Sequence, residues 1–173
     1  MTKDASRPSS ISEKEKFSSG GKRHIILLRG KWGLAIDKVI LWATGYSLVT
    51  KQYCAAMGNA YQPTLLLKTI GAKSGELRLC GLPFFEVGDS YVVRGSNGGG
   101  PTDPHWVHNV RANEAAWVRI NRKWRPVTAA VASGKEREVL FEKLCEMAYT
   151  TRRYQDMCAP RELPLVVLRA RAS

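Results

Sequence analysis

The sequence predicts an α+β protein built on an antiparallel β-barrel with flanking helices. Six short apolar runs have strand-like composition, and tight turns separate most of them. They cover residues 64–70, 77–87, 91–95, 117–121, 124–132 and 163–170. The regular alternation of strands and helices that a parallel sheet needs is absent. Sequential strands joined by turns therefore favour a six-stranded antiparallel split barrel.

The length of 173 residues suits one barrel domain preceded by shorter segments. Residues 1–22 are rich in Ser, Lys, Glu and Gly and predict a disordered tail. Residues 23–60 predict an N-terminal helical segment, and residues 61–173 predict the barrel. Gly81 and Pro83 interrupt the second strand and indicate a bulge or kink.

An amphipathic helix is predicted from about residue 31 to residue 57. Its apolar positions recur at helical spacing and are Trp32, Ile36, Val39, Ile40 and Ala43, with Asp37 and Thr44 on a polar stripe. Two interpretations stay open at this point. The apolar face can pack on the core, or residues 22–57 can contact an anionic membrane surface.

Two further helices are indicated by their starting residues. Ser133 and Glu136 have capping-box spacing and predict a helix through about Ala148. Asp103 is a suitable cap residue, and Pro104 suits the first position of a helix that follows it.

The net charge of +12 points to an anionic partner. Nucleic acid is not expected, because Trp117 and Trp124 lie in strand-like contexts that suit a core. No metal site is expected either, since His105 and His108 lack a third ligand nearby and the cysteines form no CxxC pair. Neither a leader peptide nor a membrane span is recognised, so a cytoplasmic location is predicted.

Two glycine-containing loops are the candidate ligand site. The first, TIGAKSGELR at residues 69–78, supplies Lys73, Ser74 and Arg78 as donors for phosphate. Taken alone, it is equally consistent with an ordinary basic hairpin turn. The second, SNGGGP at residues 96–101, leads into a helix start, which is a common place for an anion. Trp106 and Asn109 share one face of that helix.

These motifs, in this order, resemble the deazaflavin-dependent nitroreductase family, which has a split β-barrel flavin-binding fold. The family pattern is a TTGRKSGxxR turn, a Ser-x-Gly-Gly loop, a Pro-x-Trp-x-x-Asn helix and a terminal apolar strand. Here the matching segments are residues 69–78, 96–99, 104–109 and 163–167. The resemblance covers roughly residues 61–170.

The resemblance implies binding of the deazaflavin coenzyme F420, whose phosphate and oligoglutamate tail are polyanionic. It assigns the tail to Lys73, Ser74 and Arg78, and the deazaflavin to Ser96, Asn97, Gly98, Gly99, Trp106 and Asn109. Tyr149 and Tyr154 are the candidate catalytic residues on the acceptor side. Ala72, where Arg is usual, removes a tail contact, and Val107 replaces a frequent Tyr on the substrate side.

The implied activity is hydride transfer from reduced F420 to a small-molecule acceptor, which can be a quinone, an enone or a nitroaromatic. The alternatives are an FMN-dependent oxidoreductase of the same barrel fold and a non-catalytic cofactor-binding module. A membrane quinone would place the protein at the inner face of the plasma membrane. The oligomeric state is left open.

Overall fold

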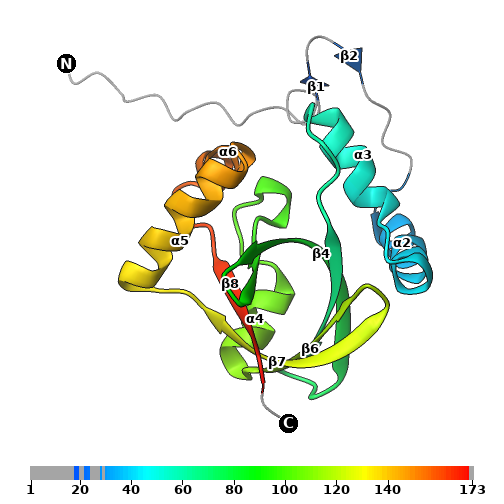
Figure 1. The fold of residues 1–173 in the computed structure, drawn as a ribbon, viewed down its shortest axis with the longest axis vertical. Helices are drawn as coiled ribbons and strands as arrows, with labels where there is room; N and C mark the ends of the chain where they lie inside the picture. The colour runs from blue at the N-terminus through cyan, green and yellow to red at the C-terminus, as the bar shows by residue number, and fades with distance from the viewer. Residues whose placement is uncertain (1–17, 20–21, 24–27, 29, 172–173) are drawn as a thin grey trace, which may run out of the picture.

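The computed structural model describes residues 18–19, 22–23, 28 and 30–171, and its centre is a closed six-stranded barrel (Figure 1). The barrel strands are β3 (Thr64–Ile70), β4 (Leu77–Val87), β5 (Ser90–Arg94), β6 (Ala115–Ile120), β7 (Lys123–Val131) and β8 (Leu165–Ala170). Their order around the barrel is β3-β4-β5-β8-β7-β6, and every pair is antiparallel. The predicted fold class is confirmed, and β3 and β4 have the predicted bounds.

Helices cover the barrel on two sides. Figure 1 shows α2 (Gly30–Thr44) and α3 (Leu48–Ala56) on one side, with α5 (Gly134–Met147) and α6 (Thr150–Cys158) on the other. Helix α4 (His105–Ala112) packs on β3 and β7. Helix α6 was not predicted, because it is short and its mean hydropathy is low. Within the described part of the chain, no helix is long and apolar enough to cross a membrane.

Ahead of the barrel, β1 (Ser18–Ser19) and β2 (Lys22–Arg23) form a short antiparallel pair. The tail predicted for residues 1–22 otherwise lies outside the described residues.

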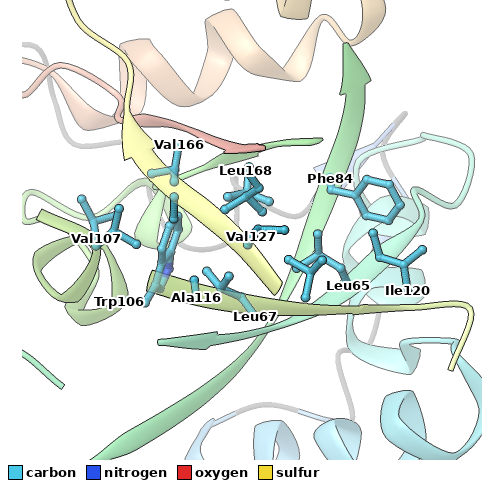
Figure 2. Packing of buried hydrophobic residues seen from close by; sticks show 14 residues of the cluster. Leu65, Leu67, Phe84, Trp106, Val107, Ala116, Ile120, Val127, Val166 and Leu168 are labelled. Atoms are coloured by element: carbon cyan, nitrogen blue, oxygen red, sulfur yellow. The ribbon is translucent and has the colours of Figure 1, made fainter. Parts of the chain in front are cut away.

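The barrel interior is filled by alternate residues of the strands and by the buried face of α4. Leu65 and Leu67 from β3 meet Val166 and Leu168 from β8 in this cluster. Trp106 and Val107 enter it from α4, as Figure 2 shows. A second cluster lies between the outer barrel wall and α5 and α6, where Val92 and Leu165 meet Leu144. The barrel is therefore packed on its inside and on the side covered by these helices.

Trp117 on β6, expected to suit a core, lies outside the barrel interior. Ala116, Val118 and Ile120 line the interior, whereas Trp117 is half-buried on the outside. Trp124 on β7 is also half-buried outside the interior cluster. The expectation that both tryptophans suit a core is wrong, because Trp106 already fills the interior from α4 and smaller side chains suffice beside it.

The predicted helix of residues 31–57 is two helices joined by a corner. Gly45 has φ 79°, which ends α2, and Ser47 caps α3 by accepting a hydrogen bond from the Thr50 amide. Asp37, predicted on the polar stripe, is buried and holds the corner. It accepts hydrogen bonds from the Ser47 hydroxyl at 2.7 Å and from the Val49 amide at 3.0 Å.

Because Asp37 faces inward, the predicted apolar face of α2 points outward. Trp32 is 85% exposed, Val39 is 66% exposed and Ile36 is 50% exposed. The interpretation that this face packs on the core is therefore wrong for these three side chains. Gly33 and Leu41 join Asp37 on the buried face of the helix.

Two predicted caps differ from the structure. Ser133 precedes α5 but makes no side-chain capping bond, so the capping box does not form. Pro104 is the N-cap of α4, because the Asp103 carboxylate is engaged by arginine side chains instead.

The turns follow the predicted chemistry with small shifts. The β6–β7 turn is at Asn121 and Arg122, both with positive φ, one residue earlier than expected. Gly81 and Pro83 lie within a continuous β4. Residues of β4 up to Pro83 pair with β3, and those from Phe84 onward pair with β5. At Gly81 a Cβ atom would lie 3.0 Å from the Leu41 side chain, so this glycine permits close packing of α2.

We expect Asp37→Ala to lower the free energy of unfolding by about 2–4 kcal/mol, since two buried donors lose a charged acceptor. Urea denaturation followed by circular dichroism measures this loss. Asp89→Ala, in the exposed β4–β5 turn, is the matched control and should change stability little. Equal effects of the two substitutions would show that Asp37 does not stabilise the corner.

Candidate functional site

The first loop, residues 71–76, is a compact turn between β3 and β4. The Gly71 amide donates to the Glu76 carbonyl at 2.8 Å, and the Gly75 amide donates to the Gly71 carbonyl at 2.8 Å. Gly75 has φ +69°, a conformation that favours glycine, and nothing lies within 4 Å of a Cβ atom placed there. The backbone at Gly75 is therefore open to a ligand.

Three donor side chains of the predicted motif at residues 69–78 are exposed. The Arg78 guanidinium pairs with Glu76 at 2.6 Å, and both side chains are more than half exposed, at 57% and 66%. Arg78 also donates to the Ser74 hydroxyl at 3.3 Å, while Lys73 lies beside them and is exposed. An exposed ion pair of this kind contributes little to stability, about 0–1 kcal/mol. Arg78 is therefore available to an incoming anion.

The second loop, residues 95–103, contains the short helix η1 (Asn97–Gly99). Asn97, Gly98 and Gly99 all have positive φ. The Asn97 side-chain amide donates to the Thr102 carbonyl at 3.1 Å, which closes the loop on itself. At Gly99 a Cβ atom would meet the Met157 side chain of α6 at 2.3 Å, so α6 packs directly against this loop.

Arg161, between α6 and β8, binds the second loop from its inner side. Its guanidinium donates to the carbonyls of Gly95 at 3.1 Å, Ser96 at 3.1 Å and Gly100 at 2.9 Å. It also pairs with Asp103 at 2.8 Å, and the two side chains are only 13% and 12% exposed. This network fixes three carbonyls of one loop around a single buried cation.

Asn109 joins the two loops. Its side-chain oxygen accepts a hydrogen bond from the Ala72 amide at 3.0 Å, and its side-chain nitrogen donates to the Thr69 hydroxyl at 3.1 Å. Asn109 is buried on α4, which starts directly after the second loop. Trp106 anchors the same helix in the barrel interior (Figure 2). Asn109 therefore links the first loop to α4, the helix that follows the second loop.

The two candidate tyrosines differ in their surroundings. The Tyr149 hydroxyl donates to the Met57 carbonyl at 2.8 Å, which ties the start of α6 to the end of α3. The Tyr154 hydroxyl has a weaker contact with the Met57 sulfur at 3.8 Å. Burial raises the pKa of Tyr154 above its ordinary value, and the charge of Arg94 opposes that shift. The Tyr154 hydroxyl is thus kept protonated and only loosely engaged.

Arg94 is a buried cation that sequence reasoning missed. Its guanidinium donates to the hydroxyls of Thr150 at 3.2 Å and Thr151 at 2.9 Å. It lies 4.8 Å from the Phe85 ring centre and 5.2 Å from that of Tyr154. Burial lowers the pKa of Arg94. The sequence indicated neither Arg94 nor Arg161 as a site residue, because Arg is rarely buried and neither residue belongs to a recognisable motif.

The site suits an extended polyanionic ligand. The first loop offers exposed cations and an open backbone at Gly75. The second loop offers an open backbone at Gly98, where a Cβ atom would have no neighbour within 4 Å. Among the residues that the structure describes, no cluster of three or more His, Cys, Asp and Glu could hold a metal ion. The fold therefore defines a split-barrel protein of the flavin-binding kind, with two glycine-containing loops beside α4.

The family follows from a match to the chain itself. A family model described as F420H(2)-dependent quinone reductase matches residues 48–170, which include all six barrel strands and both loops. The chain therefore belongs to the F420H(2)-dependent quinone reductase family.

Individual relatives agree with this assignment. The F420H(2)-dependent quinone reductase Rv1261c of Mycobacterium tuberculosis is 40% identical over 67 residues, or 39% of this chain and 45% of that protein. The chain thus aligns with less than half of that relative's length. The solved structure of an F420-H2 dependent reductase (FDR-A) is 34% identical, has a TM-score of 0.55, and the match covers 61% of this chain and 93% of that one. Atu2129 of Agrobacterium tumefaciens, at 12% identity and a TM-score of 0.51 over 63% of this chain and 48% of its own, shares the fold alone.

We expect Arg161→Met to raise the Kd for coenzyme F420 by about tenfold or more, because three loop carbonyls and Asp103 lose a buried cationic partner. Coenzyme fluorescence measures the Kd, and amide hydrogen exchange over residues 95–103 should speed up. Arg161→Lys, which keeps the charge, should recover part of the affinity.

Arg137→Met is the matched control for this prediction. Arg137 is equally enclosed, at 13% side-chain exposure, and its guanidinium binds Gln155 and the Leu163 carbonyl instead of the carbonyls of the second loop. If Arg137→Met weakens coenzyme binding as much as Arg161→Met does, the effect is one of general stability and the role of Arg161 is disproved.

Proposed function

We propose that this protein transfers a hydride from reduced coenzyme F420 to a quinone. The observation that carries the proposal is the pair of Asn109 hydrogen bonds, which hold a loop with exposed cations beside a glycine loop at a helix start. That arrangement suits a ligand with a planar ring system at one end and a charged tail at the other. Membership of the F420H(2)-dependent quinone reductase family supports the same cofactor.

In this proposal the first loop binds the tail of the coenzyme. Its phosphate and carboxylate oxygens accept hydrogen bonds from Lys73, Ser74 and Arg78. Hydrogen bonds between charged partners are stronger than neutral ones, so the two cations contribute most. Ala72 offers no side-chain donor there, and its backbone amide is already bound to Asn109. The grip on the tail therefore depends on Lys73 and Arg78.

The second loop and α4 bind the deazaflavin in this proposal. Ser96, Asn97, Gly98 and Gly99 lie along one edge of it, and Trp106 and Asn109 support it from α4. Since Trp106 and Asn109 are buried, they contribute by fixing the helix and the loop rather than by moving toward the ligand. Val107 is fully buried in the interior cluster, so it gives no side chain to the acceptor pocket.

The acceptor needs a proton after it receives the hydride, and we assign this proton to the hydroxyl of Tyr154. Bound reduced F420 supplies the hydride from C5 of its deazaflavin ring. Tyr154 stays protonated because burial raises its pKa, and Arg94 stabilises the tyrosinate that forms when the proton leaves. Tyr149 is less suited, because its hydroxyl already donates to the Met57 carbonyl. Enones and nitroaromatics are further acceptors that the same chemistry allows.

We expect Lys73→Ala and Arg78→Ala each to raise the Kd for reduced F420 by about 10- to 100-fold, because each removes a charged donor to the tail. Glu76→Gln is the matched control. It removes the carboxylate that competes for Arg78, so the Kd should stay equal or fall. Anaerobic titration, followed by loss of coenzyme absorbance on adding menadione, measures both binding and turnover.

Three results would contradict the proposal. Absence of coenzyme binding, with the Lys73 and Arg78 variants behaving like the wild type, rejects the F420 site. A purified protein that is yellow from bound FMN supports the alternative of an FMN-dependent oxidoreductase. Coenzyme binding without turnover of any acceptor supports the non-catalytic binding module.

We expect Tyr154→Phe to lower kcat by about 100-fold or more with little change in the Kd for F420, because it removes the proton donor alone. The wild-type kcat should stay level up to about pH 10, since a raised pKa keeps the hydroxyl protonated. Tyr149→Phe should keep kcat and lose some thermal stability. A Tyr154→Phe enzyme with wild-type kcat would assign the proton to another donor.

Peripheral contact with the inner face of the plasma membrane through residues 22–57 is also part of this proposal. The outward face of α2 supports it, because Trp32, Ile36 and Val39 are all at least half exposed. A membrane quinone would then be reduced close to where it is dissolved. The contact is consistent with a location in the cytoplasm at that surface.

A further inference from the structure

A row of alternating aromatic and cationic side chains runs from α2 onto the barrel wall. The Arg119 guanidinium lies 5.0 Å from the Trp42 ring centre and 5.9 Å from that of Trp124. It also donates to the Trp42 carbonyl at 2.9 Å. The Lys68 ammonium lies 4.2 Å from the Trp124 ring centre. These four side chains are therefore in continuous contact across four elements of the fold, α2, β3, β6 and β7.

Strand register extends this row. Trp117 on β6 is the direct neighbour of Lys68 on β3, and Arg119 is the direct neighbour of Trp124 on β7. The Arg171 guanidinium lies 5.9 Å from the Trp117 ring centre. We use the name flank face for this row together with the outward side of α2. Its members are Trp32, Ile36, Val39, Trp42, Lys68, Trp117, Arg119, Trp124 and Arg171.

The flank face is positively charged. Strands β3, β6 and β7 contain no acidic residue, and the one acid in α2, Asp37, is buried on the opposite side of the helix. Lys31 and Lys38 lie on the same flank of α2 as Trp42, because seven and four residues along a helix return to one side. The flank face therefore combines exposed apolar side chains with cationic ones, and it contains few negative charges.

Two kinds of anionic partner recognise aromatic and cationic side chains in alternation. A single-stranded nucleic acid stacks its bases on aromatic rings, and a bilayer accepts Trp at its interface beside lipid headgroups. The aliphatic members of the face decide between them. Ile36 is 50% exposed and Val39 is 66% exposed. A bilayer offers hydrocarbon to such aliphatic side chains, whereas a single-stranded nucleic acid does not.

We propose that the flank face is a docking surface for an anionic lipid bilayer, with the wall of the barrel lying on the membrane beside α2. The inference rests on the α2 contact proposed above and adds the orientation of the whole domain. Cations at the headgroup level are attracted to anionic lipids, and the tryptophans occupy the interface. The barrel is then held by its β3–β6–β7 wall rather than tethered by one helix.

Co-sedimentation with lipid vesicles tests the contribution of the wall. The full chain should bind vesicles that contain phosphatidylglycerol and should bind pure phosphatidylcholine weakly. The double variant Lys68→Gln and Arg119→Gln should lower binding to the anionic vesicles by about 30-fold, or about fivefold for each cation removed. Lys135→Gln with Lys143→Gln, both exposed on α5, is the matched control and should bind like the wild type.

Brominated acyl chains test the orientation directly, because they quench only tryptophans at the bilayer. In the variant Trp32→Phe with Trp42→Phe, the remaining tryptophans are Trp106, Trp117 and Trp124. Since Trp106 is buried in the barrel interior, quenching of this variant reports on Trp117 and Trp124. We expect clear quenching of it. The variant Trp117→Phe with Trp124→Phe should also be quenched, through Trp32 and Trp42, which are 85% and 51% exposed. Quenching of the second variant without quenching of the first would show that α2 docks alone.

Each remaining outcome overturns the inference. If the Lys68 and Arg119 double variant binds normally while Ile36→Ser with Val39→Ser abolishes binding, α2 docks alone and the barrel wall takes no part. If a single-stranded oligonucleotide binds the wild type more tightly than the vesicles do, with a steep salt dependence, the face recognises nucleic acid. If the wild type is a dimer that the Trp117 and Trp124 substitutions dissociate, the face binds a second copy. None of these measurements requires F420 turnover, so they remain separate from the proposed catalytic function.

Discussion

The side-chain amide of Asn109 is the constraint on which the candidate site depends. It connects α4 to the first loop through the Ala72 amide and to β3 through the Thr69 hydroxyl, across 37 and 40 residues of sequence. A buried amide must find such partners, because leaving either end unbonded costs about 1–3 kcal/mol. The loop can therefore take few positions relative to α4 without losing these bonds. Since α4 follows the glycine loop directly, one side chain sets the spacing between both halves of the cradle.

Arg161 applies the same principle to the glycine loop from the other side. Gly98 and Gly99, both with positive φ, do not hold one shape by themselves, because glycine allows many backbone conformations. The guanidinium collects the carbonyls of Gly95, Ser96 and Gly100, and Asp103 balances its charge. The glycines allow the backbone conformation of the second loop, and the buried guanidinium of Arg161 stabilises that one conformation. The buried position of Arg161 also removes one positive charge from the surface that a ligand meets.

Much of the fold was predictable because strand composition and turn chemistry are local properties. The bounds of β3 and β4 and the antiparallel six-stranded barrel follow from short runs and their separators. Which side of a helix or strand is buried, in contrast, depends on residues distant in the sequence. The period of α2 was correct, yet its buried side is set by Asp37, whose partners Ser47 and Val49 lie at the start of the next helix. Likewise, alternation along β6 cannot say whether Trp117 or Val118 points inward, and Trp106 from α4 decides it by filling the interior.

The site shows the same division between local motif and distant partner. The donors of the first loop and the glycines of the second are visible in sequence because they are motifs. The buried arginines are not, although they control electrostatics where chemistry is proposed. Burial alone would raise the pKa of Tyr154 and make its proton harder to release, and Arg94 opposes that shift from 5.2 Å. Arg94 can do this because Thr150, Thr151 and Gln62 satisfy its donors without adding a negative charge. A carboxylate in their place would cancel the field that assists proton transfer, so neutral partners for a buried cation are the arrangement that this chemistry requires.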